Sequence, residues 1–455
     1  MFRGPNGAGI APGAHPPARL GPEENVAWSV PVPASPSSPA VWGERLFLTT
    51  FAEGKLEVRA FDTRDGHVLW ATAVPSGSLE EFHLTEGSPA ASTPATDGRR
   101  VVSYFGSFGL VCHDLDGKEQ WRLPLPKATT AGNFGSGTSP LIVGNRVILN
   151  RDLAVGSSIL GVDLTSGKTL WETPRTESPT SYGTPIVREQ GGTTEIIMAG
   201  SIFMKGYDPA TGAERWRFRG LPSYTCTTPV LGDGLIFFAG WSPGKADAPM
   251  PTWAGVAERM DKNHDGVVSP DEFTDGPAWF KAQDIDGDGL LEQSDWDQII
   301  GLMKRGENVL VAVRPGGSGD VSETHAVWKY TRGLPYVPSP LHYDGRIYLV
   351  RDGGMATSLD AKTGAPIYAQ ERLKNAAGSY YASPVAADGR LYFLSLEGKL
   401  TIVKAGGDAP EILHQADFKE KTAATPALAG KRLFLRTPTR LIAFAERDVA
   451  GTSAP

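Results

Sequence analysis

The chain has 455 residues, of which 40% are hydrophobic, and its formal net charge at neutral pH is −7. These values are typical of a globular protein that can bury a large core. The mild acidity gives no electrostatic reason to expect binding to nucleic acid or to an anionic membrane surface. The sequence has no run of about 18 apolar residues, so no transmembrane helix is predicted.

The first 24 residues form an extension rich in Gly, Pro and Ala. Residues 1–20 contain no apolar stretch of the kind found at the centre of an export signal. The sequence therefore shows no signal peptide, and Met1 before Phe2-Arg3-Gly4-Pro5 is typical of a truncation point. A strand is predicted next, at 25–30, with Trp28 among small and apolar residues.

One sequence unit then recurs along the chain. It begins with Ser or Thr followed by Pro and continues with two short apolar strands around a tight turn. Successive prolines of these openings are 42 to 55 residues apart, except for one step of 111 residues. Four short strands in a period of about 45 residues predict the blades of a β-propeller. The eight openings are Ser38-Pro39, Thr93-Pro94, Ser139-Pro140, Thr184-Pro185, Thr228-Pro229, Ser339-Pro340, Ser383-Pro384 and Thr425-Pro426.

Two kinds of turn mark the strand ends in each unit. Asp-Gly pairs at 97–98, 233–234, 344–345 and 388–389 predict hairpins, because Gly readily adopts the positive φ of a tight turn. A second turn has the pattern Asp-x-x-x-Gly, with Trp four residues after the Gly. We expect these tryptophans to wedge neighbouring blades together and not to form a cofactor platform. The pattern occurs at Asp62, Gly66 and Trp70, at Asp163, Gly167 and Trp171, at Asp208, Gly212 and Trp216, and one residue shorter at Asp114, Gly117 and Trp121.

Eight openings predict an all-β fold with eight blades. The last unit ends soon after 441–444 and lacks its fourth strand, which the strand at 25–30 is expected to supply, with Trp28 at the tryptophan position. This closure leaves no open sheet edge between the first and last blades. The predicted organisation is an extension at 1–24, propeller at 25–241, an α-helical EF-hand pair inserted in blade 5 at 242–306, propeller at 307–445 and a tail at 446–455.

The insertion contains two twelve-residue loops with the ligand pattern of EF-hand calcium sites. In the first loop, Gly266 permits the sharp turn and Glu272 supplies a carboxylate for bidentate binding at position 12. In the second loop, Gly289 has the turn position, but position 12 is an aspartate, whose shorter side chain predicts weaker binding. The predicted calcium ligands are Asp261, Asn263, Asp265, Val267, Ser269 and Glu272, and then Asp284, Asp286, Asp288, Leu290, Glu292 and Asp295.

Helices are predicted on both sides of the loops, at 252–260 and at 293–304. The helix between the loops is predicted to be short, because Gly276-Pro277 interrupts it. Sensor EF-hands expose a groove rich in methionine. Because Met260 and Met303 are the methionines near this pair, we expect constitutive calcium binding that folds and anchors the insertion.

If Ser/Thr-Pro opens the innermost strand of each blade, alternate connections lie at opposite ends of the propeller. The short turns are then at one end and the longer loops at the other. Tyrosines precede several openings on this longer-loop rim, and two Arg-Asp pairs follow second strands there. A channel mouth of this kind could hold a planar or polar ligand; the alternative is a plugged channel whose polar groups satisfy one another. The rim candidates are Tyr182, Tyr224, Tyr336, Tyr380, Tyr381, Arg151, Asp152, Arg351 and Asp352.

The Asp-x-x-[Thr/Ser]-Gly-x-x-x-Trp motif resembles the tryptophan-docking repeat of the propellers similar to those that bind pyrroloquinoline quinone (PQQ). That WD40-like superfamily includes quinoprotein alcohol dehydrogenases and BamB-type outer-membrane assembly lipoproteins. Residues 2–7, residues 314–317 and the insertion resemble an exported bacterial subgroup of it. The resemblance covers nearly the whole chain. It implies a β-propeller fold and a periplasmic or secreted location.

Two functions follow from this resemblance. A PQQ-dependent alcohol or sugar dehydrogenase would be expected to have adjacent, disulfide-bonded cysteines over the cofactor, and a calcium ion bound by carboxylates. Here Cys112 and Cys226 are far apart in sequence and are interpreted as buried free thiols, a long-range disulfide being the alternative. The favoured hypothesis is a calcium-binding, non-catalytic propeller that binds a peptide, glycan or protein partner, and no residue is assigned a catalytic role.

Overall fold

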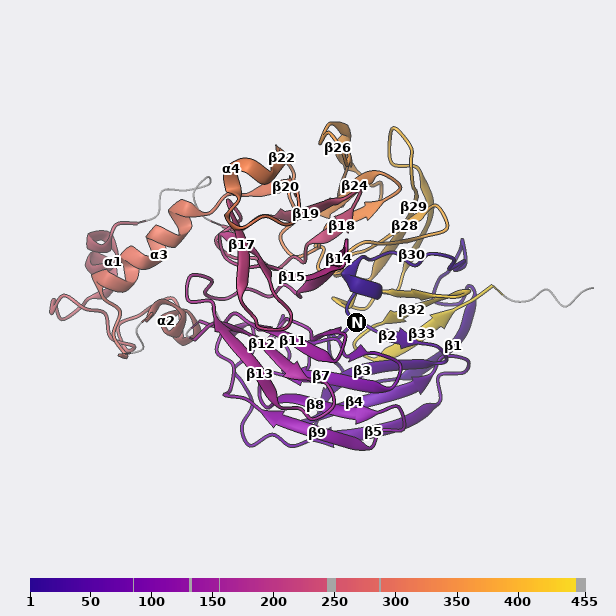
Figure 1. The fold of residues 1–455 in the computed structure, drawn as a ribbon, viewed down its shortest axis with the longest axis horizontal. Helices are drawn as coiled ribbons and strands as arrows, with labels where there is room; N and C mark the ends of the chain where they lie inside the picture. The colour runs from indigo at the N-terminus through magenta and orange to yellow at the C-terminus, as the bar shows by residue number, and fades with distance from the viewer. Residues whose placement is uncertain (85, 131–132, 155, 244–250, 286–287, 447–455) are drawn as a thin grey trace, which may run out of the picture.

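In the computed structural model, the described residues are 1–455 except 85, 131–132, 155, 244–250, 286–287 and 447–455. Eight antiparallel sheets follow one another along the chain and form an eight-bladed propeller, as predicted (Figure 1). Each sheet has four antiparallel strands, and the fourth sheet gains a short fifth strand in parallel orientation.

The first four blades run from residue 40 to residue 219. Blade 1 has β2 (Ala40–Trp42), β3 (Arg45–Ala52), β4 (Lys55–Asp62) and β5 (Val68–Val74), and blade 2 has β6 (Ala95–Thr96), β7 (Arg100–Phe105), β8 (Gly109–Asp114) and β9 (Glu119–Pro124). Blade 3 has β10 (Leu141–Val143), β11 (Arg146–Arg151), β12 (Ser158–Asp163) and β13 (Thr169–Pro174), and blade 4 has β14 (Ile186–Gln190), β15 (Thr193–Ala199), β16 (Phe203–Tyr207) and β17 (Glu214–Arg219).

The other four blades complete the ring. Blade 5 has β18 (Val230–Gly232), β19 (Leu235–Gly240), β20 (Val309–Val313) and β22 (Ala326–Tyr330), and blade 6 has β23 (Leu341–Tyr343), β24 (Arg346–Arg351), β25 (Met355–Asp360) and β26 (Pro366–Arg372). Blade 7 has β27 (Val385–Ala387), β28 (Arg390–Leu394), β29 (Lys399–Lys404) and β30 (Ile412–Asp417), and blade 8 has β31 (Ala427–Ala429), β32 (Arg432–Arg436), β33 (Arg440–Phe444) and β1 (Val26–Pro31).

Blade 8 combines the two ends of the chain. β1 pairs with β33, and Trp28 lies opposite Ala443 in the register. The predicted closure by the N-terminal strand is therefore confirmed. The middle strands of the blades are buried along most of their length, as in β7 and β11, because both faces of each sheet pack against neighbouring blades. This double burial explains why these strands are nearly continuous apolar runs.

Five of the tryptophans form a hydrogen bond to the next blade, whereas Trp216 Nε1 donates to Glu195 Oε1 of its own blade. Trp28 Nε1 donates to the Thr63 carbonyl at 2.9 Å, and Gly66, with φ of 78°, lies against the ring. A Cβ at Gly66 would come 2.6 Å from Trp28, so the motif needs glycine there. The predicted wedging role is confirmed. Equivalent bonds run from Trp70 to Leu115, from Trp121 to Leu164, from Trp171 to Pro209 and from Trp328 to Ala361.

The Ser and Thr residues of the openings form a closed ring of hydrogen bonds around the central channel. The backbone N–H of each opening donates to the side-chain hydroxyl of the next, at 3.0–3.2 Å. The ring closes where Thr425 N donates to Ser38 Oγ. These eight bonds satisfy buried amides that have no strand partner, which gives the repeated hydroxyl a physical reason.

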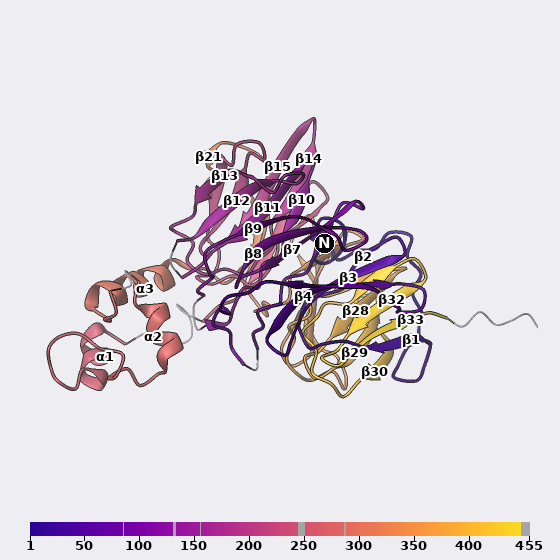
Figure 2. The ribbon, with the colours of Figure 1, turned by 90° about the horizontal axis from the view of Figure 1, so that it is seen from below.

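A helical insertion connects β19 to β20 and projects from one side of the propeller (Figures 1 and 2). It contains α1 (Trp253–Met260), α2 (Pro277–Gln283) and α3 (Gln293–Arg305), around its own apolar core. Ser242 and Asn308 exchange two hydrogen bonds at its base. After β20, β21 (Gly319–Asp320) and α4 (Ser322–His325) cover the outer edge of β17.

The N-terminal extension crosses the channel at the hairpin end, and its first residues include the 3-10 helix η1 (Pro5–Gly7). The Arg3 guanidinium is buried and donates to the carbonyls of Pro340 and Pro384. Ile10 bridges to Ala386 in parallel. The channel is thus covered from this end. Among the described residues, no helix is long and apolar enough to span a membrane.

Candidate functional site

A cavity of about 230 Å³ lies in the channel at the longer-loop rim. Seven of the eight opening residues contribute to its wall, and Phe2 of the N-terminal extension reaches it from the covered end. The rest of its lining comes from the loops that connect one blade to the next. The hydroxyl ring gives this cavity a wall fixed by eight consecutive hydrogen bonds.

The structure brings three of the predicted rim tyrosines into this cavity: Tyr182, Tyr336 and Tyr381. Tyr224 lies beside them and packs near Leu302 of α3. Tyr380 is placed differently from the prediction. Its ring is buried in the core between β24 and β28, and its hydroxyl donates to the Ala376 carbonyl at 2.8 Å.

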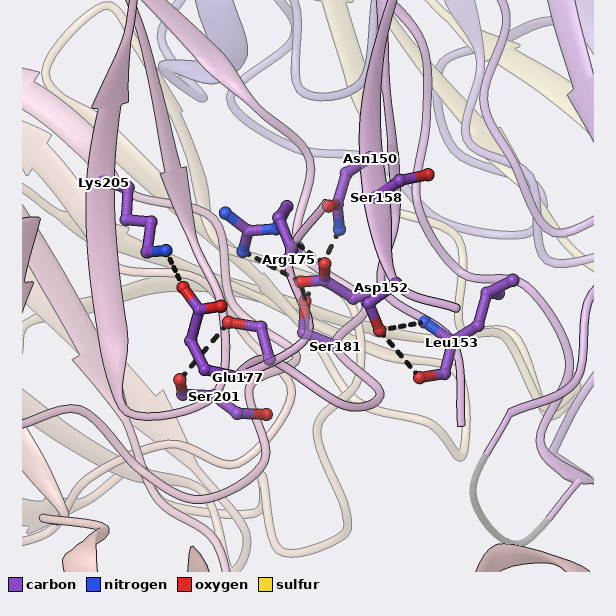
Figure 3. Close-up of polar contacts among 12 residues, drawn as sticks. Asn150, Asp152, Leu153, Ser158, Arg175, Glu177, Ser181, Ser201 and Lys205 are labelled. Carbon is purple, nitrogen blue, oxygen red and sulfur yellow. Dashed lines mark hydrogen bonds and ion pairs between the residues drawn. The ribbon is translucent and has the colours of Figure 1, made fainter. Parts of the chain in front are cut away.

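Neither predicted Arg-Asp pair lines the cavity. Asp152 forms a fully buried, bidentate ion pair with Arg175, at 2.7 and 3.0 Å, and also accepts from Ser181 (Figure 3). Arg151 donates to the Pro126 carbonyl. The interpretation of these residues as ligand groups at the mouth is therefore corrected, because neither lines the cavity and Arg175 and Ser181 already bind the Asp152 carboxylate.

The second pair has an equally structural position. Arg351 Nη2 donates to Gln370 Oε1 at 2.9 Å, and Asp352 Oδ1 accepts from the backbone N–H of Tyr380 at 2.8 Å. Both interactions fix the connection between β24 and β25 against neighbouring segments. Arg351 and Asp352 thus hold the loops behind the cavity wall and do not face its interior.

Several residues that line the cavity were not identified from the sequence, among them Phe2, Glu86, Phe134 and Cys226. Glu86 and Phe134 belong to the long connections from β5 to β6 and from β9 to β10. The one available signal was spacing, because the step of 55 residues between Pro39 and Pro94 exceeds the steps of 42 to 46 found elsewhere. Both cysteines are free, and Cys226 is partly exposed in the cavity wall.

The two long loops are fastened to one another beneath the cavity. Glu80 Oε2 accepts from the Ser136 amide at 3.1 Å and from its hydroxyl at 2.8 Å. Burial raises the pKa of the Glu80 carboxyl to about 7. His83 stacks on Phe134 with ring centroids 5.4 Å apart, and Trp279 of α2 meets the other side of this pair edge-on. The helical insertion therefore touches the loop that forms the cavity wall.

The chemistry of the cavity does not suit PQQ, the cofactor implied by the fold. PQQ is a planar tricarboxylic quinone, and buried carboxylates need basic partners. Among the described residues, the lining contains one charged side chain, Glu86, and no lysine, arginine or histidine. Burial also raises the pKa of the Cys226 thiol to about 12, so this sulfur is not a thiolate at neutral pH.

In the first loop of the insertion, carboxylates turn inward onto the loop backbone. Glu272 accepts from the amides of Lys262, Asn263 and Ser269 and from the Ser269 hydroxyl. The hydrogen bonds from Ser269 lower the pKa of Glu272 below its ordinary value. Asp261 accepts from the amides of Asp265 and Gly266. Amides of the loop thus hold two of the predicted carboxylate ligands, Asp261 and Glu272, whose hard oxygen atoms are of the type that calcium prefers.

The second loop repeats this arrangement. Asp295 accepts from the amides of Ile285 and Glu292, and Asp284 accepts from Gly289. The predicted ligand Asp286 lies outside the described residues. Val268 and Leu291 exchange two backbone hydrogen bonds of 2.9 Å, which pair the two loops. In the described part of the chain, no three His, Cys, Asp or Glu side chains are gathered closely enough to hold a metal ion without movement.

Comparisons with known proteins agree on the propeller. A family model described as outer membrane protein assembly factor BamB matches residues 23–135, 54–219 and 289–447. The crystal structure of BamB from Moraxella catarrhalis is 13% identical and has a TM-score of 0.58, covering 92% of this chain and 98% of that one.

Two other solved structures are similar. The computationally designed protein Ika8 is 9% identical, with a TM-score of 0.58 over 92% of this chain and 99% of its own. A europium-containing methanol dehydrogenase is 11% identical, with a TM-score of 0.42 over 89% and 88%. The curated proteins give no match. At these identities the likeness to BamB from Moraxella catarrhalis and to Ika8 establishes the fold alone.

Proposed function

Because the chain belongs to the family of the outer membrane protein assembly factor BamB, we propose that it is a non-catalytic binding propeller whose longer-loop rim holds part of a protein partner. The cavity carries this proposal, because it lies at this rim, five aromatic side chains are among its described lining residues, and the N-terminal extension covers the channel at the other end. A periplasmic or secreted location is part of the same proposal, since the family name refers to the outer membrane.

Exposed apolar side chains surround the mouth of the cavity. Leu84 is 88% exposed, Trp279 46% and Tyr336 39%, and all three are large. Leu84 also lines an adjoining hollow that shares Glu86 and Tyr381 with the cavity. Grouped exposed apolar residues around a concave site favour protein–protein contact.

The polar groups of the cavity suit binding better than catalysis. Each hydroxyl of the ring already accepts an amide, and Ser136 donates to Glu80. A nucleophile for covalent catalysis needs activation by a base or by a lowered pKa. The pKa of Cys226 is raised instead, and burial likewise raises that of Tyr336.

Site-specific photo-crosslinking tests the partner role. A benzophenone amino acid replaces Leu84 beside the mouth, and replaces Leu170, which is 48% exposed on β13, as the matched control. In the producing cells, we expect one defined protein adduct from position 84 that is absent from position 170. Equal adduct patterns at the two positions would overturn the proposed docking rim.

We also propose that the helical insertion binds two calcium ions. Its support is the twelve-residue ligand pattern of both loops, the hydrogen bonds by which loop amides hold Asp261, Glu272, Asp284 and Asp295, and the pairing of the loops through Val268 and Leu291. Small rotations of these carboxylates from backbone amides toward a cation would complete each site. The first loop should bind more tightly, because Glu272 reaches further than Asp295.

Calorimetric titration of calcium into the purified chain is expected to show two sites that differ by about tenfold in Kd. Asp261→Ala should remove the tighter site and Asp284→Ala the weaker one. Glu258→Ala, an exposed change on α1 outside both loops, is the control. Identical heats for the wild type and the double variant would show that neither loop binds calcium.

A further inference from the structure

Charge in the channel cavity has one sign. Glu86 is the one charged side chain in its described lining, and basic side chains are missing from it. A basic side chain, Lys421, lines the adjoining hollow, and no ion pair joins it to Glu86 among the described residues. An anionic ligand would meet Glu86 without a counter-charge, whereas a cation would find a carboxylate at the mouth.

Four aromatic side chains from the connecting loops line the same cavity as this carboxylate. They are Tyr182, Tyr336, Tyr381 and Phe134. The Tyr381 hydroxyl donates to Glu86 Oε2 at 3.1 Å, which holds the carboxylate beside the tyrosine. Trp241 meets Tyr336 edge-on at 5.8 Å. An aromatic face within about 6 Å attracts an organic cation through its quadrupole.

Burial keeps the phenol and thiol groups of the cavity wall in their uncharged forms. Burial raises the pKa of Tyr381 to about 12 and the pKa of Tyr336 further above its ordinary value. Cys226 stays a neutral thiol for the same reason. The rings therefore remain uncharged phenols, with the electron-rich faces that cation–π contacts require.

The size of the cavity limits what can enter. Its volume of about 230 Å³ is below the range of about 300–1,000 Å³ that is typical of pockets for drug-sized ligands. A terminal head group fits this space, and the remainder of a larger ligand would stay outside, over Leu84 and Tyr336. This matches a side chain that extends from a bound protein.

We propose that the cavity binds an alkylammonium group, and that in the cell this group is a lysine side chain of the partner. The aromatic rings would enclose the methylene groups and the cation, and Glu86 would supply the counter-charge. The partner lysine rests on the proposed docking function, whereas the ammonium site itself depends on the cavity alone.

Titration calorimetry on the full purified chain tests the chemistry. The probes are choline, its uncharged isostere 3,3-dimethylbutan-1-ol, and Nα-acetyl-lysine amide. Choline and the lysine amide are expected to bind, and the uncharged isostere to bind at least about tenfold more weakly than choline. Equal affinity for choline and the isostere would overturn the proposal, since the cavity would then select apolar shape alone.

Variants separate the ring and the carboxylate. Glu86→Gln and Tyr336→Leu should each weaken choline binding about tenfold, whereas Tyr336→Phe, which keeps the ring face, should stay within about twofold of the wild type. Lys421→Gln in the adjoining hollow is the charge control and should leave affinity unchanged. Equal losses in Tyr336→Phe and Tyr336→Leu would overturn the role of the aromatic face.

The outcomes distinguish this inference from the proposed function. Choline binding without lysine-amide binding would overturn the assignment to a partner lysine. Binding of both probes without an adduct at position 84 would overturn the docking rim and support the ammonium site. An adduct at position 84 from a chain that binds neither probe would support docking and overturn the ammonium site.

Discussion

Asp152→Ala is expected to lower the free energy of unfolding by about 3–5 kcal/mol, the loss typical when one member of a buried ion pair is removed. Asp152 and Arg175 have fully buried side chains and share two hydrogen bonds. Although burial opposes it, the charge of Asp152 raises the pKa of Arg175. Without Asp152, the guanidinium stays charged in a site that excludes water, with the Tyr207 hydroxyl as a remaining contact.

Thermal and urea unfolding, followed by tryptophan fluorescence, measure this loss. Glu24→Ala is the control, because its ion pair with Arg19 is exposed and should contribute about 1 kcal/mol or less. In the Asp152→Ala background, Arg175→Met should restore much of the stability by removing the unpaired charge. A loss in Asp152→Ala no larger than in Glu24→Ala would show that water reaches Arg175.

This buried pair also shows why local sequence could not separate rim residues from structural ones. Arg151-Asp152 and Arg351-Asp352 have the same local pattern, after second strands at the same rim. Their roles depend on Arg175, Gln370 and other groups that are distant in sequence. Gly200 likewise leaves room for Arg175, since a Cβ there would lie 2.3 Å from Nη2. The fit between Arg175, Asp152 and Gly200 depends on how the blades pack, so it could not be predicted from the local sequence around each residue.

The fold itself was predictable because each blade repeats the same physical solution. A Trp that docks on the Gly turn of the next blade needs both residues at fixed spacing, so Gly66 and Trp28 leave a periodic trace in the sequence. The Ser/Thr-Pro openings leave another. The structural role of these openings was not predictable. The Thr93 hydroxyl accepts a hydrogen bond from the Ser38 amide of the neighbouring blade, and the ring forms only when all eight openings are packed together.

The cavity was predicted in part. Tyr182, Tyr336 and Tyr381 were identifiable because they lie just before openings, and the channel wall begins there. Tyr380 and Tyr381 share this position, but successive side chains of an extended chain point to opposite sides, so one lines the cavity and the other enters the core. Glu86 and Phe134 come from irregular loops without periodicity, so the long step between Pro39 and Pro94 indicates a longer loop around Glu86 but does not single out either residue.

Glu80→Gln is expected to make stability less sensitive to pH between about 5 and 8. Burial raises the pKa of Glu80 from 4.5 to about 7, so the folded state favours the protonated carboxyl. This contribution is fully present below pH 4.5 and is lost as the pH rises through about 7. The difference between these pKa values corresponds to about 3 kcal/mol, with ionised Glu80 disfavoured at pH 8.

The difference in unfolding free energy between the wild type and Glu80→Gln isolates this effect, because other groups titrate equally in both proteins. We expect the variant to gain about 3 kcal/mol relative to the wild type on going from pH 5 to pH 8. Glu23→Gln, an exposed change in the N-terminal extension, is the control and should show no such trend. The side-chain carbonyl of the introduced glutamine would still accept from the Ser136 amide and hydroxyl, as Glu80 does, so the loops stay fastened. A constant difference across this range would mean that Glu80 titrates like an exposed carboxyl, and that the loops beneath the cavity are open to water.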